Sequence, residues 1–240
     1  MKHYRYFDLI MALFVTVLLV SNIASSAKIV DWGVSLLGLR LSFDAGTLLF
    51  PISYIFGDVL TEVYGYRQSR RVIWAGFGAA ALMSAVLWLV RQLPGEAAWQ
   101  GYAGDAAYDM ILGGVSSGGI IIASLAAYLV GEFSNSIVLA KLKVRTQGRY
   151  LWVRTIGSTL IGEGVDSIVF VLIASAFGVF PWEIALSLIV ANYVFKVAIE
   201  TLMTPVTYRV VALLKRAERE DYYDVNTDFN PLKLGDQPLA

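Results

Sequence analysis

Two short motifs with the same arrangement of polar residues lie inside long apolar segments: GEFSNS at 131–136 and GEGVDS at 162–167. In a helix, the acid and the Asn or Asp three residues later share one face. A charge at bilayer depth costs about 2.5–3.5 kcal/mol on insertion scales, so these acids need partners or a water-filled cavity. The motifs predict either one pocket lined by both segments or polar packing that fixes a helix bundle. The candidate binding residues are Glu132, Asn135, Glu163 and Asp166.

The two motifs also resemble each other in their position. Each glutamate lies about two helical turns from the charged end of its segment, so adjacent antiparallel helices would bring both to a similar depth. The flanking glycines and serines permit close helix approach. We therefore expect the two segments to pack against each other at the motifs.

A third polar stripe contains Asn192, Lys196 and Glu200, spaced four residues apart on one helix face. An unpaired ammonium at mid-bilayer is unfavourable, so Lys196 requires an acid, either Glu200 on its own helix or one on a neighbour. We interpret Asn192 and Lys196 as candidate binding residues. Glu200 is a candidate for proton coupling or gating. An internal salt bridge is the structural alternative, and both roles are compatible.

Asp58 and Glu62 share a helix face at a spacing of four residues. They are candidates for a proton or cation site, or for gating. For Glu62 the alternative is a helix end at the membrane interface, because basic residues follow at Arg67, Arg70 and Arg71. Asn22, in a segment rich in small residues, is a further candidate for a hydrogen bond to substrate across a helix interface.

Several kinds of chemistry are missing from the sequence. Cysteine is absent, and the single histidine is His3 in the polar leader. The sequence contains no zinc-protease, serine-hydrolase or Walker A motif. We therefore expect no enzyme activity, no metal site and no cofactor. An Asp/Glu-based membrane hydrolase and a structural scaffold remain the weaker alternatives. The chemistry available is binding by acids, amides, hydroxyls, aromatic rings and one lysine.

The elements that position these residues are predicted to be membrane-spanning helices. The chain is 57% hydrophobic and 16% charged, whereas soluble domains average about 25% charged. The fold class predicted is an all-α polytopic membrane protein with six transmembrane helices. The transporter domain covers 1–214, and its spans are expected near 8–27, 43–64, 72–93, 114–140, 153–177 and 182–214. The last span exceeds 30 residues, so it must tilt, protrude or break near Pro205. Residues 215–240 are expected to form an exposed cytoplasmic tail.

The placement of lysine and arginine predicts the orientation. Fifteen of the 19 basic residues fall on one side of these spans, and three, Lys28, Arg40 and Arg91, fall on the other. Cytoplasmic loops carry the excess of basic residues. We therefore expect a multi-pass protein of the bacterial inner membrane with both termini in the cytoplasm.

Longer motifs carry a resemblance to a known family. They are DAGTLLFP at 44–51, GDVLTEVYG at 57–65, the two motifs described above, NYVFK at 192–196 with Glu200 and Thr201, and DFNP at 228–231. In these the chain resembles the queuosine precursor transporter family, also called the vitamin uptake transporter family. The resemblance extends over about 7–231.

The resemblance implies an importer of 7-cyano-7-deazaguanine or 7-aminomethyl-7-deazaguanine, with a fold similar to the substrate-binding subunits of energy-coupling-factor transporters. Glu132 or Glu163 would accept from the guanine-like edge, and Asn135, Asn192 and Lys196 would donate. Asp58, Glu62 or Asp166 would carry coupling protons.

The alternative function is a substrate-binding subunit for a vitamin or nucleobase-like molecule that needs a separate ATPase module. The first helix lacks the A-x-x-x-A docking motif of such subunits and offers only Ala12-x-x-x-Thr16, which favours a stand-alone carrier. Expected partners are the lipid bilayer and a small deazaguanine, with no nucleic acid. Ala75-x-x-x-Ala79 could support a homodimer or packing within the monomer.

Overall fold

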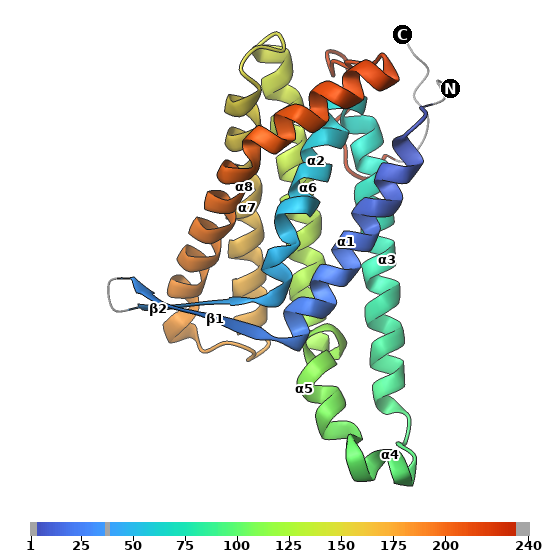
Figure 1. Cartoon of the computed structure of the whole chain (residues 1–240), viewed down its shortest axis with the longest axis vertical. Coiled ribbons are helices and arrows are strands. Elements are labelled where there is room, and N and C mark those ends of the chain that lie inside the picture. Colours follow the sequence, from blue (N-terminus) through green and yellow to red (C-terminus); the bar gives the residue numbers. More distant parts are fainter. Residues whose placement is uncertain (1–3, 37–38, 234–240) are drawn as a thin grey trace.

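The structure is a computed structural model that describes residues 4–36 and 39–233 (Figure 1). Its elements are α1 (Phe7–Ala27), β1 (Ile29–Leu36), β2 (Leu39–Asp44), the 3-10 helix η1 (Ala45–Leu48), α2 (Phe50–Tyr64), α3 (Tyr66–Gln92), α4 (Ala97–Tyr102), α5 (Gly104–Ser116), α6 (Gly118–Arg145), α7 (Leu151–Ala176) and α8 (Trp182–Glu218).

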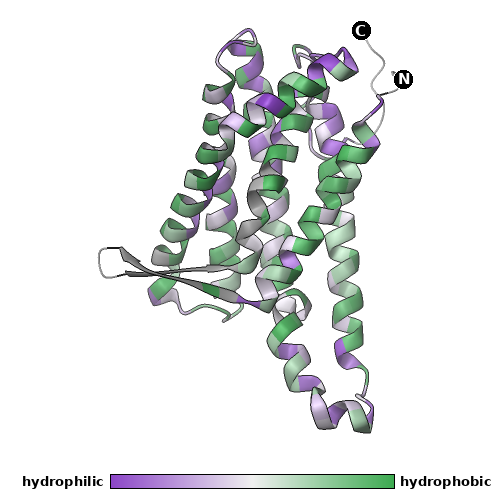
Figure 2. Ribbon diagram, viewed as in Figure 1, coloured by the Kyte–Doolittle hydropathy of each residue, from purple (hydrophilic) through white to green (hydrophobic). Residues whose placement is uncertain are grey.

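Five helical stretches in the described part of the chain are long and apolar enough to cross a membrane. They are Phe7–Ala27, Tyr66–Gln92, Gly104–Arg145, Leu151–Ala176 and Trp182–Glu218. Their outward faces carry large apolar side chains, such as Leu82, Leu186 and Leu202, each at least 66% exposed. Figure 2 shows this apolar colouring along the helices and more polar residues at their ends. Such an exterior suits lipid rather than water. The predicted polytopic helical membrane fold is confirmed, with five such stretches in the described residues where six spans were expected.

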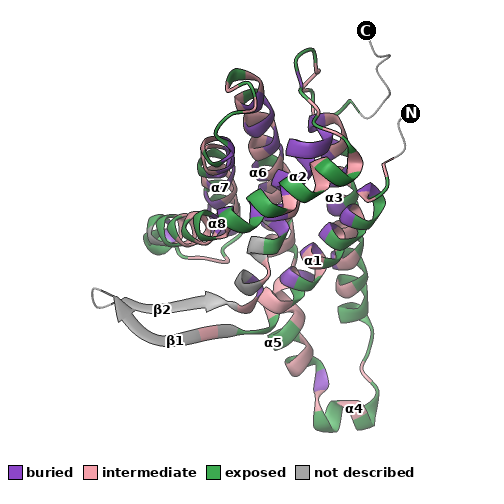
Figure 3. Cartoon of the chain, turned by 45° about the horizontal axis from the view of Figure 1, so that its top comes forward, coloured by how far each residue is buried: buried purple, intermediate pink, exposed green. Residues whose placement is uncertain are grey.

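Helix α2 is short but lies inside the bundle. It has 15 residues, about 22 Å at 1.5 Å per residue, and it contacts α1, α3, α6 and α8. Every residue from Gly57 to Tyr66 is buried, as the purple colouring of α2 in Figure 3 shows. The range 43–64, expected as one helix, instead holds the end of β2, η1 and α2. Pro51 near the N-terminus of α2 suits a helix start, where its missing N–H is not needed.

A β-hairpin that the sequence analysis did not predict connects α1 to η1. Strands β1 and β2 pair antiparallel, from Ile29 opposite Asp44 to Leu36 opposite Leu39. The Ala45 N–H donates to the Lys28 carbonyl at 2.8 Å and closes the base of the hairpin. In Figure 1 the hairpin extends across the end of the bundle opposite to the start of α1.

Helix α8 runs without a break from Trp182 to Glu218 and contains Pro205. Its 37 residues span about 55 Å, well beyond the hydrocarbon core of about 30 Å. Figure 1 shows its last turns passing obliquely over the bundle toward the start of α1. There Glu218 accepts a hydrogen bond from the backbone N–H of Tyr6 at 2.7 Å. Helix α8 is therefore not interrupted at Pro205, although its last turns run at an angle to its first part (Figure 1).

Residues 215–233, expected as an exposed tail, are mostly exposed or half-buried, but they are docked on the bundle. Helix α8 continues to Glu218, and the following residues fold back onto the ends of α2, α3 and α6. The Tyr222 N–H donates to the Val63 carbonyl at 3.2 Å, and Asp224 is only 4% exposed. Composition alone suggested exposure because the segment is polar, but its polar groups have partners on the bundle.

Candidate functional site

The two GE motifs meet where α6 and α7 cross. A Cβ built on Gly131 would lie 2.8 Å from the Cβ of Asp166, and a Cβ built on Gly162 would lie 2.7 Å from the Cβ of Asn135. Each glycine thus accommodates the Asn or Asp of the other motif. The short turn between Arg145 and Leu151 makes the helices antiparallel neighbours. The expectation that these segments pack together at the motifs is confirmed.

Lys196 of α8 lies against two acids of α7. Its Nζ is 3.0 Å from Oε2 of Glu163, and it also donates to Asp166. Glu163 and Asp166 are three residues apart, so both carboxylates face the same side of α7. Lys196 therefore pairs with acids of a neighbouring helix, α7, which is one of the two arrangements expected from the sequence. This ion pair joins α7 to α8 at the depth of the motif crossing.

The carboxyl groups of Asp58 and Glu200 are held by neutral donors. Asn135 donates from Nδ2 to Oδ1 of Asp58 at 3.1 Å, and Thr159 donates to Glu200. Asp58 and Glu200 lie close enough to interact with each other. Asp58 is 2% exposed and Glu200 is 6% exposed. These contacts bring α2, α6, α7 and α8 together in one polar region.

Glu132 completes this region from α6. A Cβ built on Gly57 of α2 would lie 3.3 Å from its Oε2, so the glycine makes room for the carboxyl. Glu132 interacts electrostatically with Asp58, Glu163, Asp166 and Lys196. We call the residues Asp58, Glu132, Asn135, Glu163, Asp166, Lys196 and Glu200 the central cluster.

The charge balance of the central cluster limits what it can do. It contains five carboxyl groups and one ammonium, from Lys196. If all five were ionised, four negative charges would remain uncompensated in a region walled by apolar helices, at a high energetic cost. The cluster therefore suits the binding of protons or of a ligand rich in N–H donors.

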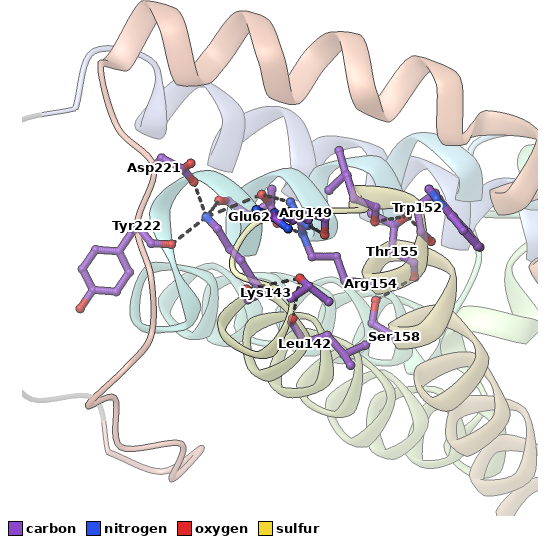
Figure 4. A network of polar contacts seen from close by, with 12 residues as sticks. Glu62, Leu142, Lys143, Arg149, Trp152, Arg154, Thr155, Ser158, Asp221 and Tyr222 are labelled. Carbon is purple, nitrogen blue, oxygen red and sulfur yellow. Dashed lines mark hydrogen bonds and ion pairs between the residues drawn. The ribbon is translucent and has the colours of Figure 1, made fainter.

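Glu62 belongs to a second network, at the end of the bundle where α1 begins and α8 ends. Arg154 of α7 donates to it twice, from Nε at 2.7 Å and from Nη2 at 2.8 Å. Lys215 of α8 donates at 2.6 Å, and Nζ of Lys143 on α6 lies 3.6 Å away. Figure 4 shows Arg154 and Lys143 beside Glu62, which is fully buried. We call Glu62, Lys143, Arg154, Lys215 and Asp221 the end network.

Asn22 is not brought to either group. Its Nδ2 donates to the Leu18 carbonyl of its own helix at 2.7 Å. Asn192 lies one turn before Lys196 on α8 and is half-buried. The structure thus assembles most of the residues singled out in the sequence, and it separates Glu62 and Asn22 from the others.

Several members of these networks were missed as functional candidates. Lys143, Arg154 and Lys215 entered the sequence analysis only as evidence for orientation, and Thr159 is one of many hydroxyls in α7. A signal was present in Arg154, which follows Trp152 and Val153 at the start of an apolar span. An arginine there needs a carboxylate, and the structure supplies it from Glu62.

A buried triangle of hydroxyl groups lies between the two networks. Thr61 of α2, Ser69 of α3 and Ser136 of α6 are within 3.0–3.1 Å of one another. All three are at most 1% exposed. Each hydroxyl can donate once and accept once around the triangle, which ties three helices together without charge.

Two hollows in the described part of the chain have no residue of the central cluster in their lining. One of about 610 Å³ is at the tip formed by α3, α4 and α5, between Val90 and Asp109. Another, of about 200 Å³, lies between α7 and α8 and is lined by Gly164 and Tyr193 among others. Gly164 and Tyr193 directly follow Glu163 and Asn192 in the sequence, so this second hollow, with the Tyr193 ring in its lining, is close to the motifs.

Comparison with known proteins adds a family and several relatives. The family model described as "Putative vitamin uptake transporter" matches residues 44–210. A protein of Escherichia coli (strain K12) named "Queuosine precursor transporter" is 31% identical over 202 residues, which cover 81% of this chain and 84% of that protein.

Two further relatives carry the name "Probable queuosine precursor transporter". The one from Bacillus subtilis (strain 168) is 25% identical over 190 residues, covering 78% of each chain. The one from Haemophilus influenzae (strain ATCC 51907 / DSM 11121 / KW20 / Rd) is 29% identical over 168 residues, covering 69% of this chain and 67% of the relative. No solved structure matches.

Proposed function

The chain belongs to the queuosine precursor transporter family, whose family model describes putative vitamin uptake transporters, and we propose that it imports queuosine precursors across the bacterial inner membrane. The observation that carries this proposal is the central cluster, in which four helices place five carboxyls and one lysine inside a membrane protein. Such a site suits ligand binding and proton coupling. The names of the relatives likewise describe transporters.

The chemistry of a 7-deazaguanine fits the central cluster. Its N1–H and 2-amino groups donate side by side and suit one carboxylate, Glu132 or Glu163. Its O6 accepts, and Lys196, Asn135 and Asn192 supply donors around it. The substrates we propose are 7-cyano-7-deazaguanine and 7-aminomethyl-7-deazaguanine. A base that leaves these buried polar groups unpaired would be rejected.

Coupling to protons is assigned to the other carboxyls of the cluster. Asp58 and Glu200 have neutral hydrogen-bond donors and lie near each other, so a proton on one carboxyl stabilises the pair. Asp166 shares Lys196 with Glu163, and it can release that lysine when substrate enters. Glu62 has three cationic neighbours, so we assign it to closure of the bundle end instead of to coupling.

The orientation that we propose places the end network on the cytoplasmic side. Arg154, Lys143 and Lys215 lie at that end, together with the start of α1 and the end of α8. Basic residues concentrate on cytoplasmic loops. Both termini would then be cytoplasmic, and substrate would leave at this end.

A stand-alone carrier is our preferred form of the proposal, and dependence on an ATPase module is the alternative. Uptake that follows the proton gradient supports the first, and uptake that follows ATP with a co-purifying ATPase supports the second. A homodimer through the face of α3 that contains Ala75 also belongs to the proposal, because Ala75 is exposed and Gly78 has no atom within 4 Å of a built Cβ.

The test is uptake of labelled 7-cyano-7-deazaguanine by cells that cannot synthesise it, with queuosine in tRNA as the readout. We expect the gene to restore queuosine and a protonophore to abolish it. The variants Glu132→Gln and Glu163→Gln should remove uptake while the protein remains in the membrane fraction. The matched control is Gly113→Ala in α5, where a built Cβ has no atom within 4 Å. Normal uptake by both glutamine variants would remove these acids from the site. If the well-expressed parent protein does not restore queuosine, the proposed substrate is wrong.

A further inference from the structure

The segment after α8, residues 221–233, is fastened to the bundle by groups from several helices. Its first anchor is Asp221, which accepts from Lys143 and lies 2.8 Å from Nζ of Lys215. Lys143 also donates to the carbonyl of Tyr222 at 2.8 Å and to the carbonyl of Glu62 at 2.6 Å. One lysine therefore joins the segment directly to the C-terminal end of α2.

The second anchor is the junction between α2 and α3. Gly65 has φ +82°, and a Cβ built on it would lie 2.2 Å from Cδ1 of Tyr222. The glycine is required both for this backbone conformation and for the space that the Tyr222 ring occupies. Asp224 then accepts from the backbone N–H of Tyr66 at 3.1 Å and from Thr227 at 2.8 Å. It supplies the side-chain cap that α3 lacks locally.

The third anchor is formed by main-chain carbonyls of the DFNP motif. Tyr66 donates from its hydroxyl to Phe229 at 3.1 Å, Arg70 donates to Asn230 at 2.7 Å, and Trp74 donates from Nε1 to Pro231 at 2.8 Å. These donors are spaced along one face of α3 at i, i+4 and i+8. DFNP is one of the motifs that carry the resemblance to the family, and these contacts give it a structural role.

The anchors connect the segment to α2, the helix that contributes to both networks. Helix α2 carries Glu62 at the end network and Asp58, one turn away, in the central cluster. Asp221 neutralises part of the excess positive charge that Arg154, Lys143 and Lys215 place around Glu62. Figure 4 shows Asp221 beside Lys143. Release of the segment would leave three cations facing one carboxylate, which favours their separation.

We propose that residues 221–233 are a strap that holds the α1-start/α8-end side of the transport path closed, and that transport requires this strap to release. The role of the strap in transport rests on the proposed function. The docking of the strap does not, because it is a property of the fold. In the structure the strap is docked, and Ser158 of α7, between the end network and the motif crossing, is fully buried.

The absence of native cysteine makes the first test clean. A Ser158→Cys variant is treated with a membrane-impermeant maleimide applied from the strap side, in vesicles of defined orientation. With the strap intact we expect slow labelling. Adding Asp221→Asn or Trp74→Phe, each of which removes one hydrogen-bonding group of an anchor, should increase the labelling rate. For Asp221→Asn, which loses a charge-assisted hydrogen bond, we expect an increase of about tenfold. Unchanged labelling in both variants would overturn the strap as a closing device. This readout does not use the substrate.

The second test locks the strap. Lys141 lies over the Phe229 ring, with Nζ 5.2 Å from its centroid, so the double variant Lys141→Cys with Phe229→Cys can be joined by a short, reducible thiol cross-linker. We expect cross-linking to abolish uptake of labelled 7-cyano-7-deazaguanine and reductant to restore it, while the uncross-linked variant transports. Undiminished uptake after complete cross-linking would overturn the required release. If no variant and no parent protein transports, the proposed substrate fails, and the maleimide result still decides the strap.

Discussion

Gly131 of α6 packs directly against Asp166 of α7, with only 2.8 Å between a Cβ built on the glycine and the Cβ of the aspartate. The reciprocal contact, of Gly162 with Asn135, is equally close at 2.7 Å. The two motifs therefore pack with an approximate twofold relation, although their polar residues differ. Asn135 donates to the acid Asp58, and Asp166 accepts from the base Lys196. Helix α6 thus presents a donor to the carboxyl on α2, and helix α7 presents an acceptor to the ammonium on α8.

The first prediction concerns this close packing. Gly131→Ala and Gly162→Ala should each separate α6 from α7, because real Cβ atoms do not approach a neighbour below 3.0 Å. We expect a loss of about 1–3 kcal/mol in stability, as for other overpacked sites, together with reduced uptake. Thermal unfolding in detergent measures the first effect. Gly113→Ala in α5 is the control, since a built Cβ has no atom within 4 Å there, and it should be neutral or stabilising because alanine favours helix. Equal melting temperatures for all three variants would refute the packing argument.

The sequence predicted the parts of this fold that depend on periodicity and on the cost of buried charge. The matched depth of the GE motifs and the need of Lys196 for an acid both follow from helix geometry and membrane energetics. The hairpin and the short helix α2 could not be predicted in this way. Residues 43–64 are apolar enough for a span, and only packing around α2 selects 15 helical residues there. The docking of residues 221–233 depends on carbonyl groups, which every residue possesses and no composition reveals.

The second prediction concerns the pairing of Lys196. Asp166→Asn removes one of its two carboxylates and should weaken both stability and uptake, since a hydrogen bond to a charged group contributes about 1.5–3 kcal/mol. The double variant Asp166→Asn with Lys196→Met removes the unbalanced ammonium as well. We expect it to recover stability, because replacing both partners of a buried pair is tolerated better than replacing one, but not uptake. Recovery of uptake in the double variant would show that the pair is purely structural.

The third prediction concerns Glu62. Glu62→Gln leaves Arg154, Lys143 and Lys215 without their shared carboxylate, and breaking a buried pair in this way typically costs about 3–5 kcal/mol. Arg154→Lys should have a smaller effect with the same sign, because lysine keeps the charge but cannot donate through two nitrogens of one planar group. Unfolding in detergent provides the ranking. A lysine variant less stable than Glu62→Gln would contradict the assignment of Glu62 as the centre of this network.

The fourth prediction concerns the response of the strap to acid. Burial alone would raise the pKa of Asp221, but hydrogen bonds from Lys143 and Lys215 outweigh it and hold this pKa below its usual range. A carboxyl with a lowered pKa in the docked state favours docking above its free pKa of about 3.9. It loses that contribution as the pH falls through the docked value. A nitroxide at Val225→Cys should therefore become more mobile below about pH 4. In Asp221→Asn it should already be mobile at neutral pH, and its remaining acid response should be smaller. An acid response as large as that of the parent strap would place the titrating group elsewhere.

The fifth prediction separates the charge of Asp224 from its role as a cap. Burial raises the pKa of Asp224, and the hydrogen bonds from Thr227 and from the Tyr66 N–H only partly counter this. Its charged form is thus disfavoured, and any stability tied to protonation is lost as the pH rises through the raised value. Asp224→Asn keeps an acceptor for the Tyr66 N–H without a buried charge, so its melting temperature at neutral pH should match or exceed that of the parent. Asp224→Ala removes the cap and should cost about 1 kcal/mol while increasing the mobility of the nitroxide at Val225→Cys. If alanine and asparagine behave alike, the contact to Tyr66 does not hold the strap, and the anchors at Asp221 and Pro231 must do so without it.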